Sequence, residues 1–144
     1  MTSLFGTWQL WAILAAVFAS LTAIFAKVGV ADIGSDFATF LRTLVVVAVL
    51  GMILWATDQY EPLGSISLKS ALFLVLSGLA TGASWVCYFR ALKLGQASQV
   101  APVDKLSVVL VAIFGAVFLG EHLSPTGWFG VSLVGTGAIL IAMS

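Results

Sequence analysis

The chain has 144 residues, of which 61% are hydrophobic and 8% are charged, and its mean hydropathy is +1.15. A soluble domain carries roughly a quarter charged residues, so this composition excludes an ordinary soluble globular fold. Six basic and six acidic residues give a formal net charge of zero, which offers nucleic acid no electrostatic attraction. One cysteine excludes an intrachain disulfide, and one histidine leaves no zinc-binding constellation. The composition therefore predicts an integral membrane protein surrounded by a lipid bilayer.

Five apolar stretches are long enough to cross the bilayer, because a membrane-spanning helix needs about 20 mostly apolar residues. Each is bounded by polar residues or helix breakers such as Pro62. The loops between them are too short to hold a domain outside the membrane. The expected fold class is an all-α integral membrane protein with a single five-helix domain over residues 1–144. We predict helices over residues 8–28, 37–56, 68–92, 98–119 and 126–143.

The distribution of basic residues predicts the orientation of the chain, because Lys and Arg are enriched in cytoplasmic loops. Lys69 lies on the same side as the amino terminus, whereas Lys27, Arg90 and Lys93 lie on the opposite side. We therefore expect a multi-pass protein of a bacterial-type inner (plasma) membrane, with an outside amino terminus and a cytoplasmic carboxyl terminus.

Three charged residues, Arg42, Asp104 and Lys105, lie more than one turn inside predicted membrane spans, where a charge is costly. Arg42 lies near the start of the second predicted helix, and Lys105 follows Asp104 in the fourth. Consecutive helical residues point about 100° apart, so we expect Asp104 to pair with Lys27, Arg42 or Arg90 rather than with Lys105. The two cations could instead snorkel to the headgroups. In the functional interpretation all three bind substrate, and two cations against one carboxylate favour an anionic or zwitterionic molecule.

Pro102 lies shortly before this charged pair. Proline is tolerated in the first turn of a helix, which would make it an ordinary helix start. If the helix begins earlier, Pro102 breaks it and frees backbone carbonyls beside Asp104 and Lys105. Broken helices beside charges are a common way to build transporter sites.

A polar stripe follows one face of the third predicted helix. Ser77, Thr81, Ser84 and Tyr88 have the i, i+4, i+7, i+11 spacing of a single helical face, and Trp85 adds a second aromatic ring beside Tyr88. The hydroxyls could line a wet pathway or make ordinary hydrogen bonds between helices. The rings could form an aromatic wall against an organic substrate or belong to an interfacial belt. We predict that Thr81, Ser84, Trp85 and Tyr88 bind substrate.

Small residues mark two further helix faces. Gly78 and Gly82 form a Gly-xxx-Gly pair in the third predicted helix, which is typical of close helix packing. The last predicted helix, over 126–143, is rich in glycine and has no ionisable group. It is a candidate contact between copies of the chain.

Several of these segments resemble the EamA domain of the drug/metabolite transporter superfamily. The fourth predicted helix begins with Val-Ala-Pro-Val-Asp-Lys-Leu-Ser over 100–107, ends with Leu-Gly-Glu over 119–121, and is followed by the glycine-rich last helix. Tyr88 followed by Ala91-Leu92, together with Lys27 and Arg42, also matches family positions. The order and spacing of these motifs extend the resemblance over essentially the whole chain.

The resemblance implies a secondary transporter of a small organic metabolite or drug. Typical EamA transporters carry two five-helix domains in inverted orientation, whereas one such domain is recognised here, so we expect a homodimer or a partner half-transporter. Smaller relatives in the superfamily rely on a glutamate in their first helix, which residues 8–28 lack. The alternative is a non-transporting membrane subunit, or a half-transporter that pairs with a different membrane protein. No constellation of catalytic residues, metal ligands or cofactor-binding motifs is recognisable, so neither an enzyme nor a cofactor is expected.

Overall fold

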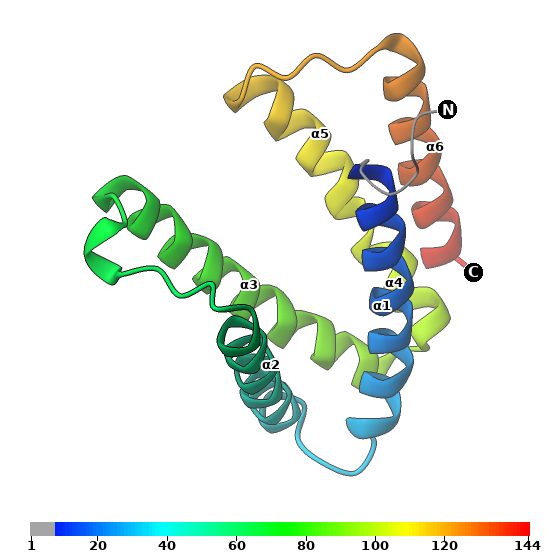
Figure 1. The fold of residues 1–144 in the computed structure, drawn as a ribbon. Helices are drawn as coiled ribbons and strands as arrows, with labels where there is room; N and C mark the ends of the chain where they lie inside the picture. Colours follow the sequence, from blue (N-terminus) through cyan, green and yellow to red (C-terminus); the bar gives the residue numbers. More distant parts are fainter. Residues whose placement is uncertain (1–7) are drawn as a thin grey trace. The chain divides into compact units, whose positions relative to one another are not determined.

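A computed structural model of the protein describes residues 8–144, so the first seven residues of the expected domain lie outside the described part. The described chain is helical and contains no β-strand. In chain order (Figure 1), the elements are α1 (Trp8–Gly29), α2 (Ser35–Thr57), the short 3₁₀-helix η2 (Leu63–Ser65), α3 (Leu68–Leu94), α4 (Ala97–Asp104), α5 (Leu106–Phe118) and α6 (Pro125–Ala142).

Five helical stretches in the described chain have the length and apolar composition needed to cross a bilayer. They are α1, α2, α3, the combined stretch Ala97–Phe118 that contains α4 and α5, and α6. Most of their large apolar side chains point outward and are exposed, as expected where lipid rather than water surrounds the protein. The predicted class, an all-α multi-pass membrane protein with five apolar helices, is confirmed.

Local sequence sets the residues at which α6 and α3 begin. Before α6, the hydroxyl of Ser124 accepts a hydrogen bond from the Gly127 N–H at 3.1 Å, and Pro125 occupies the first helical turn. Before α3, the Ser67 hydroxyl accepts from the Ser70 N–H at 3.1 Å. These serines satisfy backbone donors that the first turn of a helix leaves unpaired.

The fourth membrane span, predicted over 98–119, is interrupted, which is the second of the two alternatives that the sequence left open for Pro102. Pro102 has no backbone N–H, so it cannot donate to the carbonyl of Ser98. Lys105 then donates to the Pro102 carbonyl at 3.0 Å and accepts from the Val108 N–H at 2.9 Å. These bonds join residues three apart, which is the tighter spacing of a 3₁₀ turn. The turn divides the span into α4 and α5 at Lys105.

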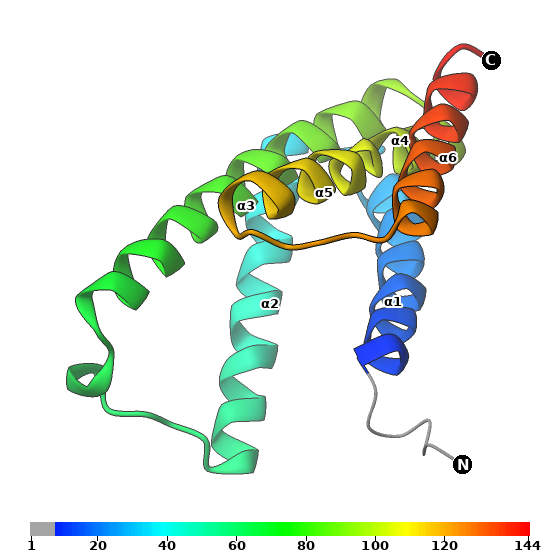
Figure 2. The same cartoon turned by 90° about the horizontal axis from the view of Figure 1, so that it is seen from above.

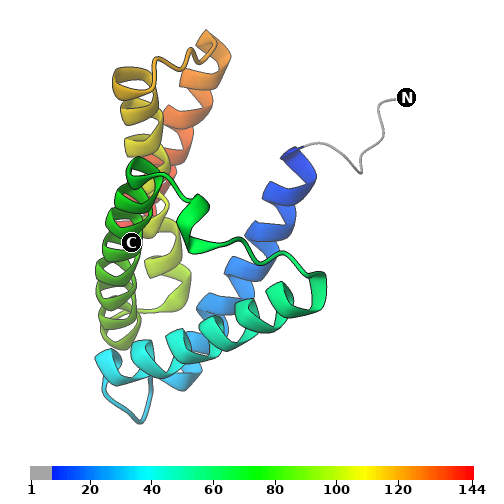
Figure 3. The same cartoon turned by 60° about the vertical axis from the view of Figure 1, so that its left-hand side comes forward.

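The chain divides into two compact units, which are described separately. The first contains residues 8–27 and 94–144 of the described part. In it α6 packs against both α4 and α5, and α5 and α6 lie side by side (Figure 3). A Cβ on the buried Gly135 would lie 3.1 Å from Cγ2 of Val109, so the missing side chain allows α5 and α6 to approach closely. The Lys27 ammonium donates to the Gly95 carbonyl at 2.7 Å.

The second unit contains residues 28–93, and α2 and α3 form most of it. The first turns of α2 and the last turns of α3 lie close together. From there the two helices diverge toward the loop that contains η2 (Figure 2). The least exposed side chains of this unit are Val30, Phe89 and Leu92. The divergence leaves space between α2 and α3.

A left-handed glycine ends α5. Gly120 has a φ of 66°, which turns the chain so that the N–H of Glu121 donates back to the Gly115 carbonyl at 3.1 Å. The Glu121 side chain also folds back. Its Oε2 lies 2.7 Å from the position that a Cβ on Gly115 would occupy. The Leu-Gly-Glu motif is therefore a helix stop in which Glu121 covers the small residue Gly115.

We expect Gly120→Ala to destabilise the protein, because a Cβ in the left-handed region costs about 1–2 kcal/mol. Gly130→Ala is the matched control, since Gly130 lies within α6 and a Cβ there meets no atom within 4 Å. Thermal unfolding in detergent should show a lower midpoint for Gly120→Ala and an unchanged or higher midpoint for Gly130→Ala. Equal midpoints would show that Gly120 is not needed for the turn.

Candidate functional site

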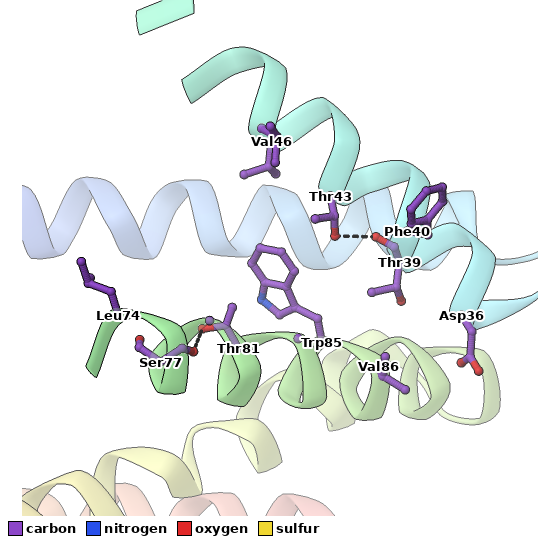
Figure 4. Close-up of a pocket in the computed structure, with 13 residues that line it drawn as sticks. Asp36, Thr39, Phe40, Thr43, Val46, Leu74, Ser77, Thr81, Trp85 and Val86 are labelled. Carbon is purple, nitrogen blue, oxygen red and sulfur yellow. Dashed lines mark hydrogen bonds between the residues drawn. The ribbon is translucent and has the colours of Figure 1, made fainter. Parts of the chain in front are cut away.

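A groove lies between α2 and α3 within the second unit, and we call it the α2–α3 groove (Figure 4). Its volume is about 610 Å³. Sites for small organic molecules have volumes of about 300–1,000 Å³, so the groove is large enough for one. Its lining comes from both helices: Asp36, Thr39, Phe40, Thr43, Val46 and Val47 from α2, and Leu74, Ser77, Gly78, Thr81, Gly82, Trp85 and Val86 from α3.

Threonine hydroxyls interrupt the largely apolar lining of the groove. Thr39 donates to the Ser35 carbonyl, Thr43 to the Thr39 carbonyl and Thr81 to the Ser77 carbonyl, each at 2.8 Å. Each hydroxyl therefore uses its one hydrogen within its own helix, and its oxygen can still accept hydrogen bonds. These three side chains present the groove with acceptors.

Arg42 and Trp85 meet beside the groove. The Trp85 ring projects from α3 into the space between the two helices (Figure 4), and the guanidinium carbon of Arg42 lies 4.2 Å from its centroid. The same carbon lies 5.6 Å from the centroid of Phe89. The guanidinium is thus held by cation–π contacts from two residues of α3. Its Nη1 atom is buried and has no hydrogen-bond partner among the described residues.

An ion pair closes the narrow end of the groove. Arg90 of α3 donates from Nε and Nη2 to the two carboxylate oxygens of Asp36 on α2, at 2.9 and 2.6 Å. The Lys93 ammonium donates to the Ile33 carbonyl just before α2. Both contacts connect the end of α3 to the beginning of α2. Because a bidentate pair fixes both side chains, it defines the distance between the helices at this end.

The expectation that Asp104 does not pair with Lys105 is wrong, because their side chains pair at 3.3 Å. Arg90 pairs with Asp36. The expectation assumed a continuous helix through both residues, but the helix stops at Lys105, and the long lysine side chain bends back to the carboxylate. Asp104 and Lys105 belong to the first unit, at the break between α4 and α5. Their predicted role in substrate binding stays a prediction.

The remaining predicted site residues have different positions. Thr81 and Trp85 line the groove, and Arg42 contacts Trp85. Among the described residues that line it, neither Ser84 nor Tyr88 is present, although Tyr88 interacts electrostatically with Arg42. Ser84 belongs to the predicted polar stripe, but the α3 residues that line the groove include its neighbour Trp85 instead.

Two threonines on α2 are groove residues that the sequence interpretation missed. Thr39 and Thr43 have an i, i+4 spacing, and Asp36 precedes them by three residues, so one polar stripe on α2 contains all three. Gly78 and Gly82 do not mediate close packing of α3 against α2 within the second unit. A Cβ on either glycine would meet no atom within 4 Å, and both glycines line the groove.

Comparison with known proteins identifies the family. The EamA-like transporter family matches residues 6–143. The chain belongs to this family. It is 58% identical over 137 residues to the Sinorhizobium protein named "Uncharacterized transporter in cobO 3'region", with 95% of this chain and 97% of that protein covered. It is also 28% identical over 94 residues to the Bacillus subtilis (strain 168) protein "Uncharacterized transporter YwfM", which covers 65% of this chain and 31% of that protein.

No solved structure matches the chain significantly. The predicted family resemblance is confirmed, and membership supports a transporter of the drug/metabolite superfamily rather than an enzyme. Within the described part of the chain, no group of three or more His, Cys, Asp and Glu residues could hold a metal ion. The chemistry that the groove offers is therefore hydrogen-bond acceptance by threonines, aromatic contact with Trp85 and the positive charge of Arg42.

We expect Asp36→Arg and Arg90→Asp, made singly, each to lower the thermal unfolding midpoint by a few degrees, because each places two like charges together. The double variant Asp36→Arg/Arg90→Asp restores an ion pair and should recover most of the loss. High salt should reduce the differences, since both side chains are more than half exposed. A double variant as unstable as the two losses added together would show that the pair contributes no coupling.

Proposed function

We propose that the protein is a secondary transporter of a small organic metabolite or drug, and that the α2–α3 groove forms part of its substrate pathway. The observation that carries the proposal is a groove of suitable volume between two membrane-spanning helices of an EamA family member. Its threonine oxygens and the Trp85 ring can contact a polar or aromatic molecule. Under this proposal the protein moves its substrate across the membrane chemically unchanged.

The proposed binding residues fall into two clusters. The first cluster contains Thr81 and Trp85, which line the groove, Arg42, which contacts Trp85, and Ser84 and Tyr88, which lie on the same helix as Trp85. The second cluster is Asp104 with Lys105. Its support is the interrupted span, because a helix break beside charges is a recurrent feature of transporter sites.

We also propose that the working unit is a dimer of five-helix repeats. The EamA match accounts for residues 6–143 once, whereas typical EamA transporters contain two such domains around a shared cavity. The alignment of this chain with the Sinorhizobium relative covers 97% of that protein. A second unit, either another copy of this chain or a partner half-transporter, would complete the cavity.

A second candidate function follows from the same observation. A single repeat could instead serve as a non-transporting subunit of a different membrane protein. That function predicts no flux through the purified protein and co-purification with its partner from native membranes. Flux through the purified protein alone would exclude this alternative.

We expect purified protein in liposomes to catalyse saturable counterflow of at least one compound from a radiolabelled panel of amines, amino acids, sugars and organic acids. Gly82→Leu should abolish this flux, because a leucine at this position extends into the groove. Gly51→Leu is the matched control, since Gly51 lies on α2 outside the groove lining and a Cβ there also meets no atom within 4 Å.

Trp85→Ala and Lys105→Ala extend the same experiment to the two clusters. Loss of flux in both variants, with wild-type yield and stability, is the expected result. Wild-type flux in Gly82→Leu and Trp85→Ala would remove the groove from the substrate pathway. Absence of flux for every compound in the wild-type protein would contradict transport by this chain alone, as a homodimer.

Reporters fused to the carboxyl terminus, active either inside or outside the cell, should report a cytoplasmic location in a bacterial inner membrane. The physical reason is the excess of Lys27, Arg90 and Lys93 over Lys69 on the two sides of the predicted topology. Signal from both reporters would instead show insertion in two orientations. It would make an antiparallel homodimer the working assembly.

A further inference from the structure

We infer that Arg42 and Trp85 form a binding site for the carboxylate of an organic anion whose apolar body lies in the α2–α3 groove. The inference rests on the proposed transport function and names the substrate class for that same site. It would assign Arg42 the task of selecting the charge of the substrate. The groove would then select its size and apolar character.

The first support is the missing counter-ion of Arg42. A cation in a membrane span is costly and is ordinarily paired with an acid or a carbonyl. Within the second unit, the guanidinium of Arg42 makes no ion pair and no hydrogen bond, and its Nη1 is buried. Asp36, the acid of the same helix, is already bound by Nε and Nη2 of Arg90.

The second support is that the available partners leave the donors of Arg42 unused. Trp85 and Phe89 satisfy its charge through their ring faces, but a ring face is a poor substitute for an oxygen acceptor. A guanidinium carries five N–H donors in a planar fork that matches a carboxylate. The contact with Trp85 also holds the guanidinium in place before a ligand arrives, which lowers the entropy cost of binding.

The third support is the indole N–H of Trp85. It is a donor without acceptor capacity, and it makes no hydrogen bond to any residue in the described part of the chain. Trp85 lies in the groove while its ring contacts Arg42. The cation of Arg42 therefore lies on the face of a groove-lining ring whose own N–H donor is also unused.

The fourth support is the chemistry of the remaining lining. The hydroxyl hydrogens of Thr39, Thr43 and Thr81 are used within their own helices, so these residues do not compete with Arg42 for a carboxylate. The rest of the lining is mostly apolar, and it suits the hydrocarbon part of a ligand rather than its charge. The apolar residues are Phe40, Val46, Val47, Leu74 and Val86.

The test compares three compounds of similar shape and different charge: phenylacetate, phenylacetamide and phenethylamine. Each is titrated into the purified protein in uncharged detergent, with thermal unfolding and tryptophan fluorescence as readouts. We expect saturable binding of phenylacetate and much weaker binding of the neutral amide and the cationic amine. Arg42→Gln should weaken phenylacetate binding by roughly tenfold or more, as expected for the loss of a charged hydrogen-bonded pair.

Two further variants serve as controls. Arg42→Lys keeps the charge but loses the planar fork, so it should bind phenylacetate with intermediate affinity and also reports whether position 42 tolerates substitution. Lys69→Gln removes one positive charge from an exposed residue at the start of α3 that does not line the groove. It should bind phenylacetate as the wild-type protein does.

Several results would overturn the inference. These are equal binding of phenylacetate and phenylacetamide, no binding of any compound, or unchanged binding in a folded Arg42→Gln variant. An anionic lipid could also supply the oxygens, so the titration is repeated with added phosphatidylglycerol. Loss of phenylacetate binding on lipid addition, together with Arg42-dependent lipid binding, would assign the site to a headgroup. Phenylacetate binding without any flux would contradict the transport proposal alone, whereas flux that is independent of Arg42 would contradict this inference alone.

Discussion

The requirement that every backbone N–H and C=O be paired within the hydrocarbon governs the whole structure. Continuous helices meet this requirement by themselves, and the described chain therefore places its irregular segments between helices or at short, tightly bonded turns. The interruption at Lys105 is the informative case. Hydrogen bonds between residues three apart pair most of the backbone groups there. The fourth span can therefore change direction beside Asp104 and Lys105 without leaving a series of backbone N–H and C=O groups unpaired. A helix break of this kind is compatible with lipid and with a polar site.

The charged side chain of Arg42 likewise needs a partner, because it lies within a membrane span. Its charge is partly compensated by the faces of Trp85 and Phe89, both on α3, so the cation links α2 to α3 without an acidic partner. Asp36, the acid on the same helix, is engaged by Arg90 instead. The two arginines therefore act differently. Arg90 fixes the narrow end of the groove through a complete ion pair, and Arg42 remains with unused donors next to the groove.

The sequence predicts the features of this structure that depend on a property averaged over a whole helix. It does not predict the features that depend on the position of a single residue. Five spans were predictable because hydropathy is summed over a whole helix and tolerates errors at the ends. The pairing of Asp104 with Lys105 was not predicted because it depends on the exact residue at which a helix stops. Gly78 and Gly82 carry a packing motif, but whether they meet a helix or a groove depends on the divergence of α2 and α3. That divergence is a tertiary property, so the role of Thr39 and Thr43 followed only from the structure.

The hydroxyl hydrogens of the groove threonines are used within their own helices, and this affects how a molecule can lie in the groove. Its threonines offer only oxygen lone pairs, and the guanidinium of Arg42 contacts the Trp85 ring, which lies between Asp36 at one end of the groove and Leu74 at the other (Figure 4). The two ends of the groove therefore differ in charge. A ligand with one anionic end and an apolar body would meet the cation of Arg42 at Trp85 and would extend its apolar body toward Leu74.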